Sequence, residues 1–273
     1  MAETGTATKT FDLGTPDLLL AAEGGVAWLT FNRPQARNAM TFEMYDGVIK
    51  ACDLVEADER LRVLVLKGAG GRAFASGTDI RQFQDFHVAG DVLAYEARVS
   101  RVADRLEGVK RPTIAMIQGD AVGGGMGLAM CCDMRICTPE SRFGIPTART
   151  VGNCLNIANY ARMIDLIGPM RAKELMFTAR LYNGAEAQAI GFVNEVVPLD
   201  GLEVRVRELA TTIAGNAPLT IQATKEAIRR IQVLRRIQNA DGQDLLLGCY
   251  LSADFKEGVN AFLEKRPAMW TGR

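Results

Sequence analysis

Three consecutive glycines, Gly123–Gly125, follow the apolar run 113–117 and precede the apolar stretch 128–131. Because glycine has no Cβ, the backbone here is free to approach another segment closely. If the glycines open a helix, their N–H groups lack partners within it and attract negative charge. No Lys-Ser or Lys-Thr pair follows, which excludes a P-loop. A phosphate cradle of another kind, an oxyanion hole and close packing of a helix on a sheet stay open.

A second turn, 74–79 (FASGTD), favours the oxyanion hole among these interpretations. It follows a predicted strand and offers a peptide N–H at Ser76. Two converging N–H donors are the minimum needed to hold the oxyanion of an ester or thioester.

The balance of charges excludes several classes of protein. Lys and Arg number 32, as do Asp and Glu, so the net charge is zero and gives no bulk attraction to nucleic acid or to an anionic membrane. No apolar run approaches the ~18 residues of a membrane span, and residues 1–10 lack the apolar core of a signal peptide. We therefore expect a cytoplasmic protein.

The cysteines and the single histidine argue against a metal site. The six cysteines lie mostly in apolar segments without a C-x-x-C pair, which predicts buried free thiols. His87 lies in a polar stretch and is predicted to be a solvated loop residue. We expect no metal ion.

Hydrophobic periodicity predicts an α/β body over residues 1–200 and a helical C-terminal region over 201–273. Strands are predicted at 17–22, 26–31, 62–67, 113–118, 133–138, 141–143 and 192–197. Helices are predicted at 41–58, 91–109, 155–166, 170–178, 184–190, 202–215, 218–238, 241–254 and 257–264.

One competing motif occurs at Gly68-x-Gly70-x-x-Ala73, which formally matches a dinucleotide-binding fingerprint. Such a fingerprint requires a helix that opens at the glycines, and Arg72–Ser76 has neither a cap nor helical spacing. An NAD-dependent oxidoreductase remains a minor alternative.

Several motifs in order resemble the enoyl-CoA hydratase/isomerase (crotonase) superfamily. They are Asn32-Arg-Pro, Phe74-Ala-Ser-Gly-Thr-Asp-Ile80, Gly119-x-x-x-Gly-Gly-Gly125, Cys132-Asp133, Phe143-Gly-x-Pro146, Ala187-x-x-x-Gly191-x-Val193 and Phe262-Leu-Glu-Lys-Arg-Pro267. Each motif is weak alone, but the ordered set spans nearly the whole chain.

The resemblance implies a ClpP/crotonase-type spiral of β-β-α units with a helical C-terminal region that builds a homotrimer or a hexamer made of two trimers. It implies an acyl-CoA thioester as substrate, with coenzyme A present only as part of that substrate. By position, the N–H groups of Ser76 and Gly124 form the oxyanion hole. The implied CoA-binding residues are Gln35, Ala36, Arg37, Ser76, Gly77, Thr78, Asp79, Ile80, Lys265 and Arg266.

The sequence departs from the superfamily at two positions. Hydratases of the family carry one glutamate two residues after the three glycines and another directly after Phe-Gly-x-Pro. Gly127 and Thr147 occupy these positions here. Neither side chain can act as a carboxylate acid or base, so we expect ordinary two-glutamate hydration to be absent or very weak.

Isomerisation, decarboxylation, C–C cleavage and thioester hydrolysis remain possible reactions. Candidate replacement groups are Arg149, Asn153, Cys154, Asn156, Tyr160 and Glu96. Capping and packing of the helix near Leu155 is the alternative role for the Asn and Cys residues, and a surface pair with Arg98 is the alternative for Glu96. A non-catalytic acyl-CoA-binding or assembly subunit is the alternative function.

Overall fold

Two sheets form the centre of the structure, a computed structural model that describes residues 8–273. The larger sheet has the order β1-β2-β3-β4-β6-β8-β11 and the smaller one β10-β9-β7-β5. The strands are β1 (Lys9–Phe11), β2 (Leu18–Glu23), β3 (Val26–Phe31), β4 (Val63–Gly68), β5 (Ala73–Ala75), β6 (Thr113–Ile117), β7 (Asp120–Val122), β8 (Met134–Cys137), β9 (Arg142–Gly144), β10 (Tyr182–Asn183) and β11 (Glu195–Val196).

Helices occupy the connections and the C-terminal region. They are α1 (Phe42–Ala57), α2 (Ala89–Gly108), α3 (Gly124–Met130), α4 (Ile157–Thr178), α5 (Gly184–Ala189), α6 (Leu199–Gly215), α7 (Pro218–Leu234), α8 (Gln243–Tyr250) and α9 (Ala253–Glu264). Short 3-10 helices are η1 (Pro34–Ala36), η2 (Ile80–Asp85), η3 (Thr147–Arg149) and η4 (Asn239–Gly242).

Local sequence signals explain the first elements. Gly24 and Gly25 have φ values of 57° and 82°, which suits the tight turn of the β2–β3 hairpin. Thr41 caps α1 by accepting a hydrogen bond of 3.3 Å from the Met44 N–H. The predicted hairpin and the predicted start of this helix are both confirmed.

The larger sheet is covered by helices on both faces because its strands carry apolar side chains on both sides. Leu202, Val206 and Ala210 of α6 pack against one face. Met44 and Val48 of α1 belong to the cluster on the other face, together with buried residues of α2, α3 and α4. Two-sided burial is typical of a largely parallel α/β sheet, so the predicted α/β body is confirmed.

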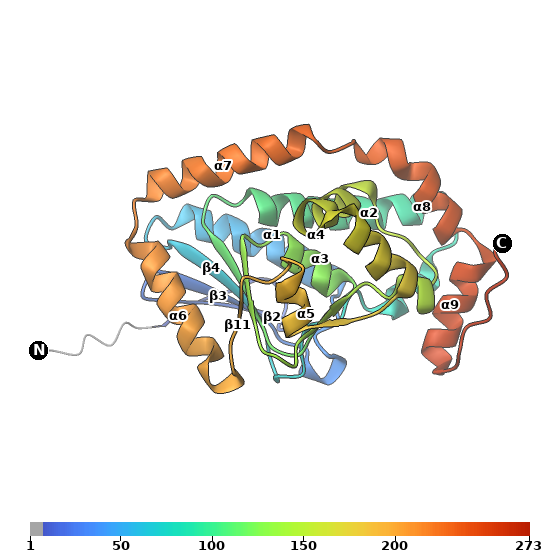
Figure 1. The fold of residues 1–273 in the computed structure, drawn as a ribbon, viewed down its shortest axis with the longest axis horizontal. Helices are drawn as coiled ribbons and strands as arrows, with labels where there is room; N and C mark the ends of the chain where they lie inside the picture. The colour runs from blue at the N-terminus through green and yellow to red at the C-terminus, as the bar shows by residue number, and fades with distance from the viewer. Residues whose placement is uncertain (1–7) are drawn as a thin grey trace, which may run out of the picture.

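The C-terminal helices lie along the outside of this body. Figure 1 shows α7 along one long edge, with α6 at one end and α8 and α9 at the other. Phe255 of α9 packs against Phe83 of η2, whereas α7 has no buried residue. Because α6 packs directly on the sheet, the packing does not mark a boundary at residue 200, and the division there stays a prediction.

The small sheet was largely missed from sequence. β5, β7 and β10 are two or three residues long, too short for a periodic pattern. The dinucleotide interpretation is wrong, because Gly70 and Gly71 (φ 78° and 70°) form a turn that leads into β5 and no helix opens there.

The described cysteines are free thiols, as predicted, and four are buried, whereas Cys154 and Cys249 are half-buried. Within residues 8–273, no cluster of potential ligands fits a metal ion, and no helix has the length and apolarity to cross a membrane.

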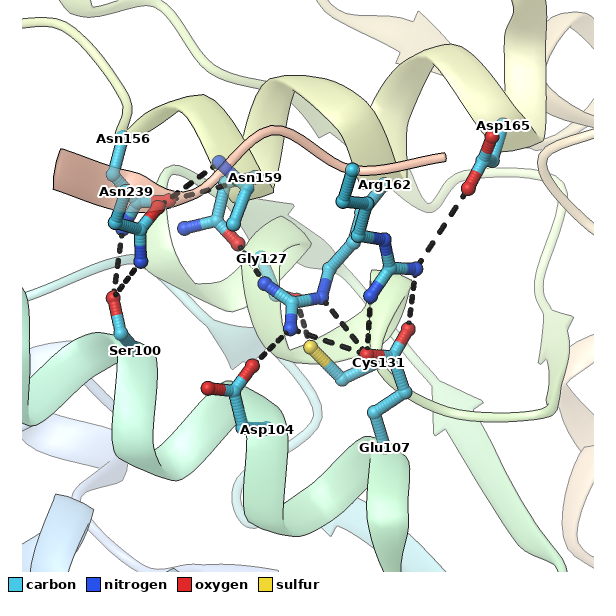
Figure 2. Close-up of polar contacts among 12 residues, drawn as sticks. Ser100, Asp104, Glu107, Gly127, Cys131, Asn156, Asn159, Arg162, Asp165 and Asn239 are labelled. Carbon is cyan, nitrogen blue, oxygen red and sulfur yellow. Dashed lines mark hydrogen bonds and ion pairs between the residues drawn. The ribbon is translucent and has the colours of Figure 1, made fainter. Parts of the chain in front are cut away.

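A buried ion network joins α2 to α4. Figure 2 shows Arg162 of α4 pointing toward Asp104 and Glu107 of α2. Its guanidinium lies 2.6 Å from Asp104 and 3.1 Å from Glu107, and its side chain is only 2% exposed. Arg236 binds Glu107 through two hydrogen bonds of 2.6 and 2.7 Å. Burial raises the pKa of Glu107, but the Arg236 hydrogen bonds and the Arg162 charge outweigh it and hold that pKa below its ordinary value.

We predict that Arg162→Met lowers the free energy of unfolding by about 1.5–3 kcal/mol, because it removes one of the two arginines that bind the buried Glu107 carboxylate and leaves only Arg236 among the described residues. Urea denaturation near neutral pH measures this. Since the pKa of Glu107 is lowered, the stability it supplies is present above its unfolded pKa and declines as pH falls toward its folded pKa. The difference in free energy of unfolding between the wild-type protein and Arg162→Met should therefore become smaller as the pH is lowered.

The control is Arg230→Met, which removes a pair with Glu226 from an arginine whose side chain is 74% exposed. It should change the free energy of unfolding far less than Arg162→Met does, because solvent screens an exposed pair. Equal costs for the two variants would contradict the assignment of the Arg162 network as a buried anchor.

Candidate active site

A cavity of about 170 Å³ lies where α3 approaches the loop after β5. Its walls come mainly from residues within 76–83, 95–103, 122–130 and 145–159, with Tyr45, Tyr250 and Phe262 completing them. Most of these side chains are apolar. Among the lining residues of the described chain, Glu96 is the one carboxylate, and none is Lys, Arg or His.

Glycine allows α3 to begin directly against the loop after β5. A Cβ on Gly125 would lie 1.9 Å from the Ala75 carbonyl oxygen, closer than any real contact. A Cβ on Gly124 would lie 3.4 Å from the Thr78 nitrogen, and one on Gly77 would lie 3.4 Å from the Gly124 nitrogen. The three-glycine segment and the 74–79 turn therefore meet, as the sequence suggested.

One of the two predicted donors at this junction differs in the structure. The Ser76 N–H donates to the Arg37 carbonyl oxygen at 3.1 Å, so the prediction that it is a free oxyanion donor is wrong. The N–H groups of Thr78 and Gly124, by contrast, have no acceptor among the described residues. Gly124 is the first residue of α3, where N–H groups lack partners within the helix.

A row of hydroxyl groups lies beside these donors. The Thr78 hydroxyl lies 2.8 Å from the Tyr45 hydroxyl and 2.7 Å from the Tyr95 hydroxyl. Burial raises the pKa of Tyr45 to about 12 and that of Tyr95 well above its ordinary value. Both tyrosines are therefore neutral hydrogen-bonding groups near pH 7.

Glu96 projects from α2 into the cavity and is 7% exposed. The Tyr250 hydroxyl donates to one carboxylate oxygen at 2.8 Å, and the Asn156 amide donates to the other at 2.9 Å. Arg98 instead pairs with Asp46 at 3.5 Å. The interpretation of Glu96 as half of a surface pair with Arg98 is thus wrong.

The two positions without glutamate both line the cavity. A Cβ on Gly127 would meet no atom within 4 Å, so the site where a longer side chain would project is open. Thr147 begins η3 and is partly exposed. Neither position contributes a proton donor or acceptor of carboxylate strength.

The structure places the candidate polar residues in different environments. Asn153, Cys154 and Asn156 line the cavity, with Asn153 donating to the Tyr250 hydroxyl at 2.8 Å. Asn156 also caps α4 by accepting from the Asn159 N–H at 2.9 Å, so the capping role is confirmed. Arg149 and Tyr160 are absent from the lining, and Arg149 is exposed.

The residues expected to bind CoA fall into three groups. The first group lines the cavity and consists of Ser76, Gly77, Thr78 and Ile80. The second group lies at η1, with Gln35 and Ala36 in that helix and Arg37 directly after it, where its carbonyl oxygen accepts from the Ser76 N–H. Asp79 is buried and pairs with Arg33 at 3.2 Å and with Arg81. Lys265 and Arg266 are exposed after α9, and Arg266 pairs with Glu257 at 2.6 Å.

Sequence reasoning missed the tyrosines. Tyr45, Tyr95 and Tyr250 come from three helices, and a tyrosine on the apolar face of a helix gives no signal that its hydroxyl reaches a cavity. The role of the Thr78 N–H could have been suspected from the alternation of N–H directions along an extended segment.

Comparisons with known proteins identify the family. The sequence model of the enoyl-CoA hydratase/isomerase family matches residues 21–273. A short-chain-enoyl-CoA hydratase of Clostridium acetobutylicum is 33% identical over 251 residues, covering 92% of this chain and 95% of that protein. A crotonyl-CoA hydratase of Syntrophomonas wolfei is 34% identical over 254 residues, covering 92% and 96%.

Solved structures show the same fold. An enoyl-CoA hydratase/carnithine racemase from Magnetospirillum magneticum has a TM-score of 0.78 and 32% identity, covering 95% of this chain and 97% of that one. A methylmalonyl-CoA decarboxylase complexed with 2S-carboxypropyl CoA has a TM-score of 0.86 and 27% identity, covering 95% and 100%.

Two glycines of α3 give opposite predictions for the same substitution. Gly125→Ala should destabilise the protein by about 1–3 kcal/mol or more, because its Cβ would overlap the Ala75 carbonyl oxygen. Gly127→Ala should stabilise it by about 0.5–1 kcal/mol, because the position is helical and open. Thermal and urea denaturation measure both effects. A stable Gly125→Ala protein would show that α3 does not contact Ala75 so closely.

Proposed function

Because this chain belongs to the enoyl-CoA hydratase/isomerase family, we propose that it binds an acyl-CoA thioester and stabilises the thioester enolate between the N–H groups of Thr78 and Gly124. The observation that carries the proposal is the pair of unpartnered N–H groups at one corner of a largely apolar cavity. Backbone donors fixed in this way stabilise developing negative charge without reorganisation during the reaction.

Two-glutamate hydration does not fit this cavity. Hydration needs one group to activate water and another to protonate the α-carbon. Gly127 and Thr147 supply neither, although the relatives above are named as hydratases. A proton shift within the bound acyl group requires fewer functional groups, and we propose double-bond isomerisation as the main reaction.

The charges of the lining favour an uncharged acyl group. A carboxylate on the acyl chain would meet no Lys, Arg or His among the described lining residues and would lie near Glu96. Arg149, one of the candidate replacement groups, is exposed and outside the lining, so it is not placed to bind such a carboxylate. Decarboxylation is therefore not proposed, despite the structural likeness to a methylmalonyl-CoA decarboxylase.

We further propose that η1 and residues 76–80 follow the CoA chain, and that Lys265 contacts its phosphates, in the same or a neighbouring subunit. Lys265 is exposed and makes no ion pair among the described residues, unlike Arg266. Exposed apolar side chains along α7, including Leu219, Ile231 and Leu234, support a trimeric or hexameric assembly. Sedimentation of a monomer at micromolar concentration would contradict that assembly.

The central test uses CoA thioesters with neutral acyl chains in deuterated water. We expect deuterium at the α-carbon by mass spectrometry. Crotonyl-CoA hydration should be at least about 10²-fold slower than in a hydratase that has both glutamates. Tight thioester binding without any exchange would contradict enolate formation and support a non-catalytic binding subunit.

A matched pair of variants isolates the Gly124 donor. Gly124→Ala adds a Cβ, 3.0 Å from the Tyr45 hydroxyl, but keeps the N–H, whereas Gly124→Pro also removes the N–H at a helix position that tolerates proline. Exchange should be slower in the proline variant than in the alanine variant by about 10²–10³-fold. Equal rates would show that this N–H does not hold the thioester oxygen.

A further inference from the structure

Glu96 is buried without a cation, which is costly for a carboxylate that only supports the fold. Its two hydrogen-bond partners, Tyr250 and Asn156, are uncharged. No ion pair to Glu96 occurs among the described residues, whereas the buried carboxylate of Glu107 has two arginines. An unpaired ionised carboxylate inside a protein loses several kcal/mol of hydration. Such a group in a cavity is a candidate for proton transfer.

The surroundings of Glu96 keep its carboxyl group available to accept and release a proton. Burial raises its pKa, against the opposing effect of the Asn156 and Tyr250 hydrogen bonds. The titratable groups that share the acyl cavity with it are Tyr45, Tyr95, Tyr250 and Cys154, and the pKa of each is raised. All four are therefore neutral near pH 7, and none competes with Glu96 for the proton. Two charged residues, Arg101 and Asp104, line the second cavity that Glu96 also borders.

Glu96 also lines a second cavity of about 300 Å³, as does Asn156. Figure 2 shows Asn156 and Asn239 converging on Ser100 of α2 in this region. Their amide groups donate to the Ser100 hydroxyl at 3.3 and 3.1 Å. The carboxyl group thus contacts both the acyl cavity and a polar cavity large enough for water.

We propose that Glu96 is the catalytic base and acid of this site, and that it shifts a proton between the α- and γ-carbons of a neutral enoyl thioester. This inference rests on the proposed function. Glu96 removes a proton from carbon, and the C–H electron pair moves to the thioester oxygen held by Thr78 and Gly124. The enolate then collapses, and the proton returns from Glu96 to the other carbon. No other reactant is consumed.

The second cavity adds a consequence for isotope exchange. While the enolate is bound, the proton on Glu96 exchanges with water that enters beside Ser100 and Asn156. The isomerised product therefore acquires solvent deuterium rather than retaining all of its original protons. Tyr250 and Asn156 act as positioning residues, since they hold the carboxylate of Glu96 without contacting the substrate.

The test measures conversion of a β,γ-enoyl-CoA, such as 3-hexenoyl-CoA, to the conjugated thioester in deuterated water. Glu96→Gln should slow isomerisation and exchange by about 10²–10⁴-fold while the dissociation constant for the thioester changes little. Glu96→Asp should retain part of the rate. The control is Glu140→Gln, because Glu140 is exposed and outside the cavity.

The outcomes separate this inference from the function on which it rests. If the wild-type protein incorporates deuterium and the Glu96→Gln variant does so at a rate within threefold of wild type, only the role of Glu96 is overturned. A wild-type protein that never exchanges overturns the proposed function as well. Retained thioester binding by Glu96→Gln shows that its cavity is folded.

The positioning role of Tyr250 has its own readout. Tyr250→Phe removes a hydrogen bond that lowers the pKa of Glu96. The acid limb of the pH–rate profile for isomerisation should therefore move to higher pH. A purely structural role would lower the yield or stability of the protein without moving this limb. An unchanged limb would overturn the positioning role.

Discussion

Contact between α3 and the end of β5 is the constraint on which the rest of the site depends. Gly125 lies so close to the Ala75 carbonyl group that no side chain fits between them. This approach brings the first N–H groups of α3 beside the Thr78 N–H, at the wall of the cavity. The chemistry proposed here follows from that backbone arrangement, since any larger residue at position 125 would separate the two donors.

The surrounding helices complete the site from a distance. The Arg162 network fixes α4 against α2, and these two helices carry Asn156 and Glu96. Tyr250 reaches the same carboxylate from α8, far along the chain. A polar centre is thus assembled from three helices inside an apolar enclosure, where hydrogen bonds and charges act more strongly than in water.

Sequence reasoning predicted the long elements and the meeting of the two glycine-rich turns, because each has a local physical cause. Thr41 marks the start of α1, and Gly123–Gly125 mark a close approach. It failed where the outcome depends on register or on distant partners. Ser76 and Thr78 lie two residues apart, and only the pairing of the Ser76 N–H with Arg37 decides which donor is free.

Glu96 illustrates the same limit. Its neighbours in sequence suggested a surface pair with Arg98, but the two side chains point to different surroundings on α2. Burial of Glu96 depends on Tyr250 and Asn156, which no local pattern connects to it. This chain has no carboxylate at the family's usual glutamate positions, and the one carboxylate among the described lining residues, Glu96, comes from α2.

A crystal structure with a bound, unreactive acyl-CoA analogue would show directly which N–H groups hold the thioester. We predict that the thioester oxygen lies about 2.7–3.1 Å from the nitrogen atoms of both Thr78 and Gly124. A thioester oxygen bound instead to the Ser76 nitrogen, or directed away from α3, would contradict it.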